Sequence, residues 1–176
     1  MRGKAPVVVL GAVAAAAAIV AVVFATLYVR DEPSAEGAPT QPCENRIFGH
    51  IASLSRKGER FEMRFDPAWF TSGVTANTAA AEDGAVEPGE PVPNDNYRVE
   101  EGDRLLTYLA PPSAHVTVLT RQGDPAQIGA TSISVSELEE LVEGKKPVEL
   151  FEPLDSGIWA RYHVDTVCSL DQQYQP

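Results

Sequence analysis

Three polar side chains near the carboxyl end of the chain are the residues best spaced for acid–base chemistry. Arg161, His163 and Asp165 lie two residues apart, and residues at that spacing share one face of a strand. A histidine beside a carboxylate can act as a general base, with the arginine as an electrostatic partner. Residues on one face need not hydrogen-bond, however, so a solvated strand face is the alternative interpretation of these weak catalytic candidates.

Oxygen-bearing side chains form a second group in the middle of the chain. The weak candidates for Ca²⁺ ligands are Asp83, Asn94, Asp95 and Asn96, with Glu82 or Glu100 beside them. The 12-residue calcium loop with its central Gly and terminal Glu is absent. This favours a turn whose side chains bond local backbone amides. Nucleophile-elbow, zinc-protease, P-loop and dinucleotide motifs are also absent, so no catalytic residue, metal or cofactor is predicted.

An apolar segment predicts the compartment in which the chain works. Residues 5–29 carry no charge, and a helix of that length, at about 1.5 Å per residue, spans a hydrocarbon core of about 30 Å. The cations before it predict a cytoplasmic stub at residues 1–4. We therefore expect a single-pass transmembrane anchor at 5–29, a Pro-rich acidic tether at 30–46 and an extracytoplasmic domain at 47–176.

Cleavage of this segment is the alternative to a signal-anchor. A signal peptide has an apolar stretch of about 7–15 residues before a small-residue cleavage site, and the sequence around Ala25 offers such a site. The apolar run is longer and continues past Ala25, which favours an uncleaved anchor. Either way the rest of the chain is exported, to the cell membrane or, after cleavage, as a secreted protein.

The charge of the exported part restricts its partners. From Asp31 onward the chain carries all 25 acidic residues but only 11 of the 14 basic residues, because Arg2, Lys4 and Arg30 come before it. Acidic surfaces repel phosphate backbones, so no nucleic-acid partner is expected. The expected partners are the membrane, through residues 5–29, and a protein of the cell envelope. The sequence predicts no particular oligomeric state.

Two cysteines lie at opposite ends of the predicted domain. Cys43 precedes its first apolar run and Cys168 ends its last. In an oxidising compartment such a pair most simply forms a disulfide. Free thiols or an intermolecular pairing are the alternatives.

The first half of the domain is predicted to hold a hairpin that ends at a proline. Residues 47–55 and 60–65 are expected as strands around a turn at Gly58. Because proline cannot continue a sheet ladder, Asp66 and Pro67 are predicted to end the second strand. Asp66 would cap one helical turn, and this turn would lay two aromatic residues, Trp69 and Phe70, across the end of the sheet.

The second half predicts more short strands and two helices. A short helix is expected at 75–83 and a loop at 85–96, followed by a second hairpin made of 97–99 and 104–109. Further strands are expected at 116–120 and 131–135. A helix with a capping box at Ser136-x-x-Glu139 then precedes a closing strand at 157–167. These elements predict a mainly β fold with one or two short helices: a small antiparallel barrel, OB-like, with a β-sandwich as the alternative.

Three stretches of the chain carry a resemblance to a known group of proteins. They are Asp66-Pro67-Ala68-Trp69-Phe70, Pro93-Asn94-Asp95-Asn96-Tyr97 and Leu170-Asp171-Gln172-Gln173-Tyr174. With them the chain resembles uncharacterised membrane-anchored or secreted actinobacterial proteins, over about residues 47–176. The resemblance implies an exported barrel-like domain and no known activity. This chain departs from that group at Cys168, where the group carries a basic residue, so the bridge would be an addition to the fold.

Taken together, these observations predict a binding or accessory module of the cell envelope. The absence of catalytic motifs favours a binder over an enzyme. The alternative is an envelope hydrolase that uses a pocket at His163 and Asp165. A deep cleft with a converging nucleophile beside His163 would favour the enzyme, and a flat, partly apolar surface would favour the binder.

Overall fold

The computed structural model describes residues 43–122 and 124–175. The predicted stub and anchor, and the tether up to residue 42, lie outside these residues. Within the described part of the chain, no helix has both the length and the apolar character that a membrane crossing needs.

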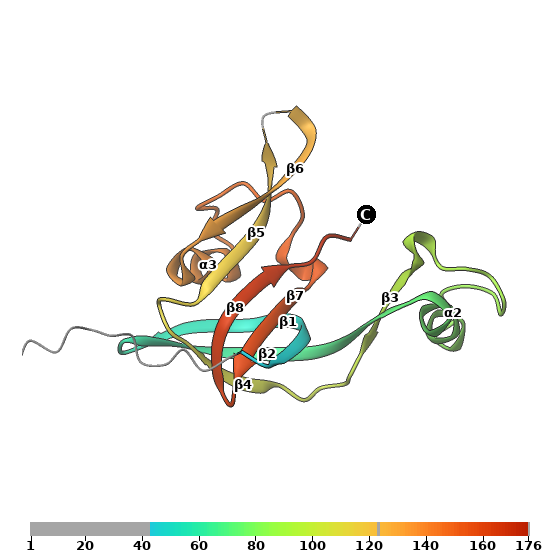
Figure 1. Ribbon diagram of the computed structural model, residues 1–176, viewed down its shortest axis with the longest axis horizontal. Helices are drawn as coiled ribbons and strands as arrows, with labels where there is room; N and C mark the ends of the chain where they lie inside the picture. The colour runs from blue at the N-terminus through green and yellow to red at the C-terminus, as the bar shows by residue number, and fades with distance from the viewer. Residues whose placement is uncertain (1–42, 123, 176) are drawn as a thin grey trace, which may run out of the picture. The chain divides into compact units, whose positions relative to one another are not determined.

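Five strands close into a barrel, which confirms the prediction of a mainly β fold built on a small barrel (Figure 1). They are β1 (Asn45–Lys57), β2 (Arg60–Ser72), β4 (Leu106–Ala110), β7 (Ile158–His163) and β8 (Thr166–Gln172). Around the barrel, β1 pairs with β2, β2 with β4, β4 with β8, β8 with β7, and β7 again with β1. The β4–β8 contact is parallel, and the other four are antiparallel.

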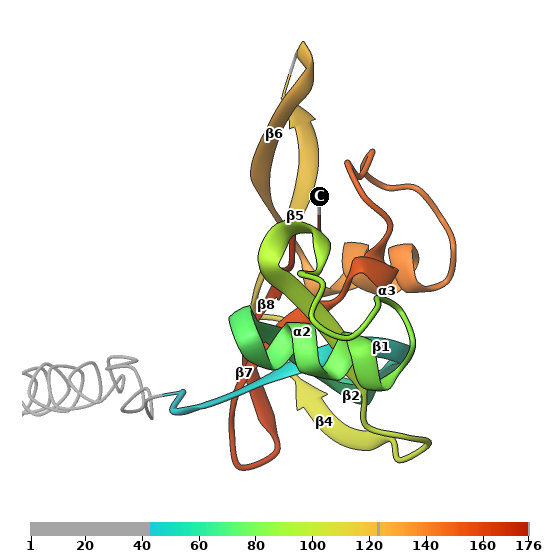
Figure 2. The same cartoon turned by 90° about the vertical axis from the view of Figure 1, so that its right-hand side faces the viewer.

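The remaining elements extend from this barrel or pack on it. They are α2 (Gly73–Glu82), η1 (Pro93–Asp95), β3 (Asn96–Glu100), β5 (His115–Gln122), β6 (Asp124–Ile133), α3 (Val135–Val142) and η2 (Leu154–Ser156). The β5–β6 hairpin projects away from the barrel, whereas α2 lies beside β3 (Figure 2). Two helices among the described residues agree with the predicted count.

The core lies inside the barrel and continues beneath α3. Phe61, Met63 and Phe65 alternate along β2 with charged residues and are fully buried, as the alternating pattern predicts. Leu138 of α3 joins the same cluster. The sequence pattern therefore identifies the barrel face of β2 correctly.

Strand β2 does not stop at Pro67, so the prediction of a helical turn there is wrong. Pro67 pairs with Gly49 of β1 inside a continuous strand. On the other side of β2, β4 pairs only as far as Phe65 and β3 begins at Ala68. Proline is tolerated where no neighbouring strand needs its N–H. Pro67 lies between two successive partners, and its missing donor is therefore harmless.

The partners of β3 and β4 also differ from the prediction. The two strands were expected to pair as a hairpin, yet both pair with β2, one on each side of Pro67. The length of β2 explains this difference. The prediction ended this strand at Phe65, whereas the continuous β2 pairs five residues with β4 and a further five with β3.

Two local details near the carboxyl end also need correction. The predicted single strand at 157–167 is a hairpin, because β7 ends at His163 and β8 begins at Thr166. The capping box lies two residues earlier than predicted: the Ser134 hydroxyl accepts from the Glu137 N–H, and the Glu137 carboxylate accepts from the Ser134 N–H. The Glu137 carboxylate accepts from both the N–H and the hydroxyl of Ser134, and these two bonds lower the pKa of Glu137.

The predicted disulfide between Cys43 and Cys168 is confirmed. Cys43 lies two residues before the start of β1, and Cys168 lies in β8, which is separated from β1 by β7 alone. The bridge therefore fastens the start of the domain across the last hairpin and closes a sequence separation of 125 residues.

Candidate functional site

A groove opens where β1 and β2 diverge. The two strands remain paired as far as Phe48 and Ala68. Beyond this pair, β1 continues along β7, and β2 continues along β3. The resulting cavity, which we call the fork groove, has a volume of about 420 Å³. It is lined by Arg46, Ile47, Phe48, Pro67, Ala68, Trp69, Phe70, Glu101, Trp159 and Tyr162.

Three aromatic rings form a continuous cluster in this groove. The ring centroid of Phe48 lies 5.1 Å from that of Phe70 and 5.1 Å from that of Trp159, distances typical of favourable aromatic pairs. The Arg46 guanidinium lies 3.6 Å from the Trp159 ring centroid. The indole N–H of Trp159 donates to Oε1 of Gln173 at 2.8 Å. These contacts hold Trp159 in one orientation.

Trp69 is an exposed aromatic residue of the groove. Its side chain is 60% exposed, although the core of this chain is large enough to bury other aromatic rings completely. The chain has two tryptophans, and both line the fork groove. Exposed tryptophan beside an apolar depression is typical of binding surfaces, where burial against a partner yields much of the binding energy.

A polar pocket of about 420 Å³ lies on the neighbouring part of the same sheet. It is lined by His50, Asp66, Arg98, Glu100, Gly102, Asp103 and Asp155. His50 and Asp66 are direct cross-strand partners in the β1–β2 ladder. The His50 ring also lies edge-on to Phe48, with centroids 6.3 Å apart. The polar pocket and the aromatic cluster of the fork groove are therefore adjacent.

One carboxylate connects the charged groups of the polar pocket. Oε1 of Glu100 accepts from Nε of Arg98 at 2.8 Å and lies 3.7 Å from Nε2 of His50. Nη1 of Arg98 also donates to the Asp155 carbonyl at 3.0 Å. Burial is the main cause that lowers the pKa of His50, and the Arg98 guanidinium lowers it further. His50 is therefore neutral at neutral pH.

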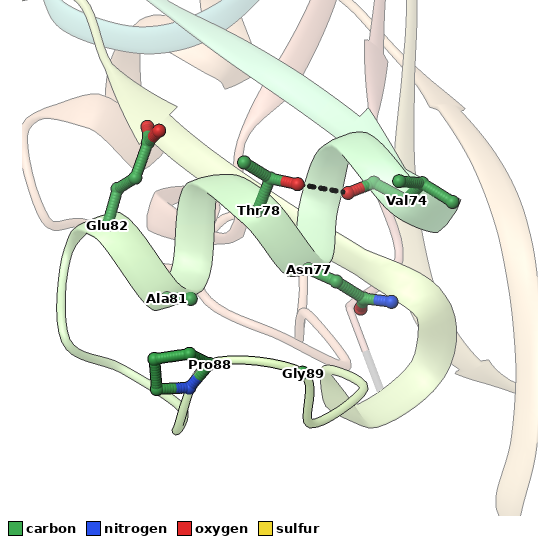
Figure 3. A pocket seen from close by; sticks show the side chains of 7 residues that line it. All are labelled: Val74, Asn77, Thr78, Ala81, Glu82, Pro88 and Gly89. Atoms are coloured by element: carbon green, nitrogen blue, oxygen red, sulfur yellow. Dashed lines mark hydrogen bonds between the residues drawn. The ribbon is translucent and has the colours of Figure 1, made fainter.

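A third cavity lies against α2 and differs in character (Figure 3). Its volume is about 520 Å³, and its lining residues are Val74, Asn77, Thr78, Ala81, Glu82, Pro88 and Gly89. The Thr78 hydroxyl donates back to the carbonyl of Val74 at 2.9 Å. No aromatic ring is among these lining residues, so this α2 cavity offers a partner much less surface for tight packing.

The predicted catalytic group is not gathered on one strand face. His163 is the last residue of β7, Val164 has a φ of 56°, and Asp165 lies in the turn before β8. The Asp165 carboxylate accepts from the Thr166 hydroxyl, and its carbonyl accepts from the Leu109 N–H. The alternating spacing therefore does not extend to Asp165, because the strand ends two residues before it.

The candidate calcium ligands serve local backbone geometry. Asn94 and Asp95 both have a φ of 59° in η1, and the Asn96 amide donates to the carbonyl of Asn94 at 2.9 Å. Asp83 instead accepts from the hydroxyl of Tyr97 at 3.2 Å. Among residues 43–122 and 124–175, no group of three or more His, Cys, Asp or Glu side chains could hold a metal ion.

Sequence reasoning missed the residues that complete the fork groove and the polar pocket. Arg46, Phe48 and His50 alternate along the first strand, and this spacing could have placed them on one face. Trp69 and Phe70 were singled out, but as part of a helical turn. Both residues line the fork groove because β2 continues past Pro67, and there the Phe70 ring centroid lies 6.1 Å from that of Trp159.

Comparison with protein-family models, with curated proteins and with solved structures found no match for this chain. The assignment of function therefore rests on the barrel, the disulfide and the two adjacent sites. Together they describe a small β-barrel domain with an aromatic groove next to a polar pocket.

Proposed function

We propose that this protein is a membrane-anchored binding module of the cell envelope, and that it engages another envelope component through the fork groove. The observation that carries this proposal is Trp69, which is 60% exposed and lines the same cavity as Phe48, Phe70 and Trp159. Burying an exposed indole against a ligand removes a large apolar area from water. Trp159 of the same groove is already held in place by Phe48, Arg46 and Gln173, so little of its conformational entropy is lost on binding.

The fold supports an OB-like assignment of the barrel. The five barrel strands are arranged in the cyclic order β1-β2-β4-β8-β7, and helix α3 lies between β4 and β7 in the chain. A closed five-strand barrel interrupted by a helix is the arrangement expected of an OB-like domain, and such folds bind extended ligands. The chain has a net charge of -11, which disfavours oligonucleotide ligands.

Three observations support the envelope location. The apolar segment at residues 5–29 has the length of a membrane span. The Cys43–Cys168 bridge is of the kind that persists in oxidising compartments. The resemblance to membrane-anchored or secreted actinobacterial proteins points in the same direction.

Cross-linking from the groove tests the binding role. A photoreactive phenylalanine analogue replaces Trp69 in the full chain, and the same analogue replaces Val74 in the control. Val74 is 81% exposed and lines the α2 cavity, so it tests whether exposure alone produces adducts. We expect a discrete adduct in intact cells from position 69 and little or none from position 74. Equal yields, or no adduct from position 69, would contradict the proposal.

A reporter at the carboxyl end tests the location separately. A fusion that is active only outside the cytoplasm is expected, because the predicted anchor leaves residues 47–176 on the outer side. Activity only inside the cell would contradict the envelope role and leave the groove geometry unaffected.

A further inference from the structure

Two polar atoms at the floor of the polar pocket lack hydrogen-bond partners. They are Nε2 of His50 and Oδ1 of Asp66, and both are closed to solvent. Buried polar atoms are normally paired, because an unpaired one carries its full desolvation penalty. Neither atom is in contact with solvent, although both residues line the polar pocket. Nε2 of His50 is a site where a proton can bind.

Charged groups face His50 from every element packed around it. Asp66 faces it from β2, Arg98 and Glu100 from β3, and Asp155 from η2. Asp103 completes the polar pocket from the segment after β3. A proton on His50 would therefore meet four carboxylates, those of Asp66, Glu100, Asp103 and Asp155, and one competing cation. The cation is Arg98, which already holds the carboxylate closest to Nε2, that of Glu100.

Arg98 also links two parts of the structure. Besides its ion pair with Glu100, it donates to the main-chain carbonyl of Asp155. This bond joins β3 to η2, and Gly157, directly after η2, lies against Phe48. A Cβ atom at Gly157 would overlap the Phe48 ring. Phe48 is only 2% exposed, and Gly157 covers its ring together with Phe70 and Trp159. We call residues 154–157 the strap.

We propose that His50 is a proton-operated latch for the strap. When His50 is protonated, it replaces Arg98 as the ion-pair partner of the Glu100 carboxylate, because the two cations compete for this one acceptor. Arg98 then releases the Asp155 carbonyl, and the strap loosens above Phe48 in the fork groove. No covalent bond changes, and the only species added is the proton on Nε2. Acidification thereby changes the floor of the groove through which the domain binds.

The direction of the linkage follows from the environment of His50. Burial and Arg98 lower its pKa from the ordinary value of 6.5, so the latched arrangement binds protons less readily than one in which His50 is hydrated. Above pH 6.5 the latch is closed. As the pH falls below that value and through the lowered pKa, the open arrangement gains stability relative to the closed one.

Fluorescence of Trp159 provides a test that needs no ligand. In the variant Trp69→Phe of the full chain, Trp159 is the single tryptophan, and its ring packs against Phe48. We expect its emission to shift to longer wavelength on acidification from about pH 7.5 to about pH 4.5, with a midpoint below the unperturbed histidine value. The His50 ring is followed by NMR in the same samples.

Three further substitutions in this background separate the latch from other titrations. His50→Gln should abolish the shift, and Glu100→Gln should abolish it while His50 still titrates. The Glu100 side chain is 51% exposed, so Glu100→Gln is expected to fold even if His50→Gln does not. His115→Gln, at an exposed histidine, should leave the shift unchanged. A titrating His50 with unchanged Trp159 emission, or a full shift in Glu100→Gln, would overturn the proposal.

Discussion

The two halves of strand β2 show how one strand serves both stability and binding. Residues 60–65 lie between β1 and β4 in the closed barrel, and Phe61, Met63 and Phe65 are 0% exposed. Residues 68–72 no longer pair with β4 but with β3, and in this part of the strand Trp69 is 60% exposed. The apolar side chains of the first half build the core, whereas those of the second half line an open groove.

Pro67 marks the change between the two halves. It lies where one outer partner of β2 ends and the next begins, and it is fully buried. Opposite it, Gly49 allows the backbones to approach closely, because a Cβ atom there would overlap the Asp66 carbonyl. Large apolar residues on a single strand therefore have different roles, depending on which strands pair with that part of it.

The largest expected effect is in the barrel half. Phe65→Ala should lower the free energy of unfolding by about 3–5 kcal/mol, since it removes a fully buried ring and leaves a cavity. Chemical denaturation of the purified protein measures this. A loss below about 1 kcal/mol would show that Phe65 is not part of a close-packed core.

The disulfide is expected to contribute next to the stability of the barrel. Replacing both Cys43 and Cys168 with Ser should cost about 2–4 kcal/mol, because the bridge restricts the unfolded chain. Denaturation with the wild type as reference measures the loss. Non-reducing peptide mapping should show the two cysteines joined, and two freely alkylated thiols in the exported protein would rule out the bridge.

A pH effect is expected at the junction of the two halves, where His50 faces Asp66. Because burial lowers the pKa of folded His50, its contribution to stability is fully present above the unfolded value of 6.5. It is lost as the pH falls through the lower folded value. The wild type should therefore lose more stability than His50→Gln between about pH 7.5 and about pH 5. Parallel curves for the two proteins would contradict this expectation.

The smallest effect on stability is expected in the groove half. Trp69→Ala should change the free energy of unfolding by about 0.5 kcal/mol or less, because the side chain is mostly exposed. The same variant should lose binding to the envelope component, measured by co-purification from cross-linked cells. A destabilisation comparable to that of Phe65→Ala would remove the distinction between the two halves.

Much of the barrel half could be predicted from the sequence. The alternation of Phe61, Met63 and Phe65 with charged residues specifies both the strand and its buried face. The Cys43–Cys168 bridge follows from position and compartment. These features depend on local patterns or on a simple pairing rule, so they can be read from a single sequence.

The groove half could not be predicted in the same way. Proline ends most central strands, and only the positions of β3 and β4 reveal that Pro67 lies between successive partners. The contact between Trp159 and Phe48 also depends on the pairing of β7 with β1, two strands that are far apart in the sequence. The spacing of His163 and Asp165 was misleading for a related reason: a turn at Val164 interrupts a pattern that resembles one strand.

Hydroxyl-radical footprinting of Trp69 tests the central claim most directly. The oxidation rate of Trp69 is compared between the full-length protein in isolated envelopes and the purified protein, with Tyr174, which is 40% exposed, as the internal reference. If the fork groove is occupied by an envelope component, Trp69 should be protected several-fold in the envelopes while Tyr174 is unchanged. Equal oxidation of Trp69 in both samples would contradict the account.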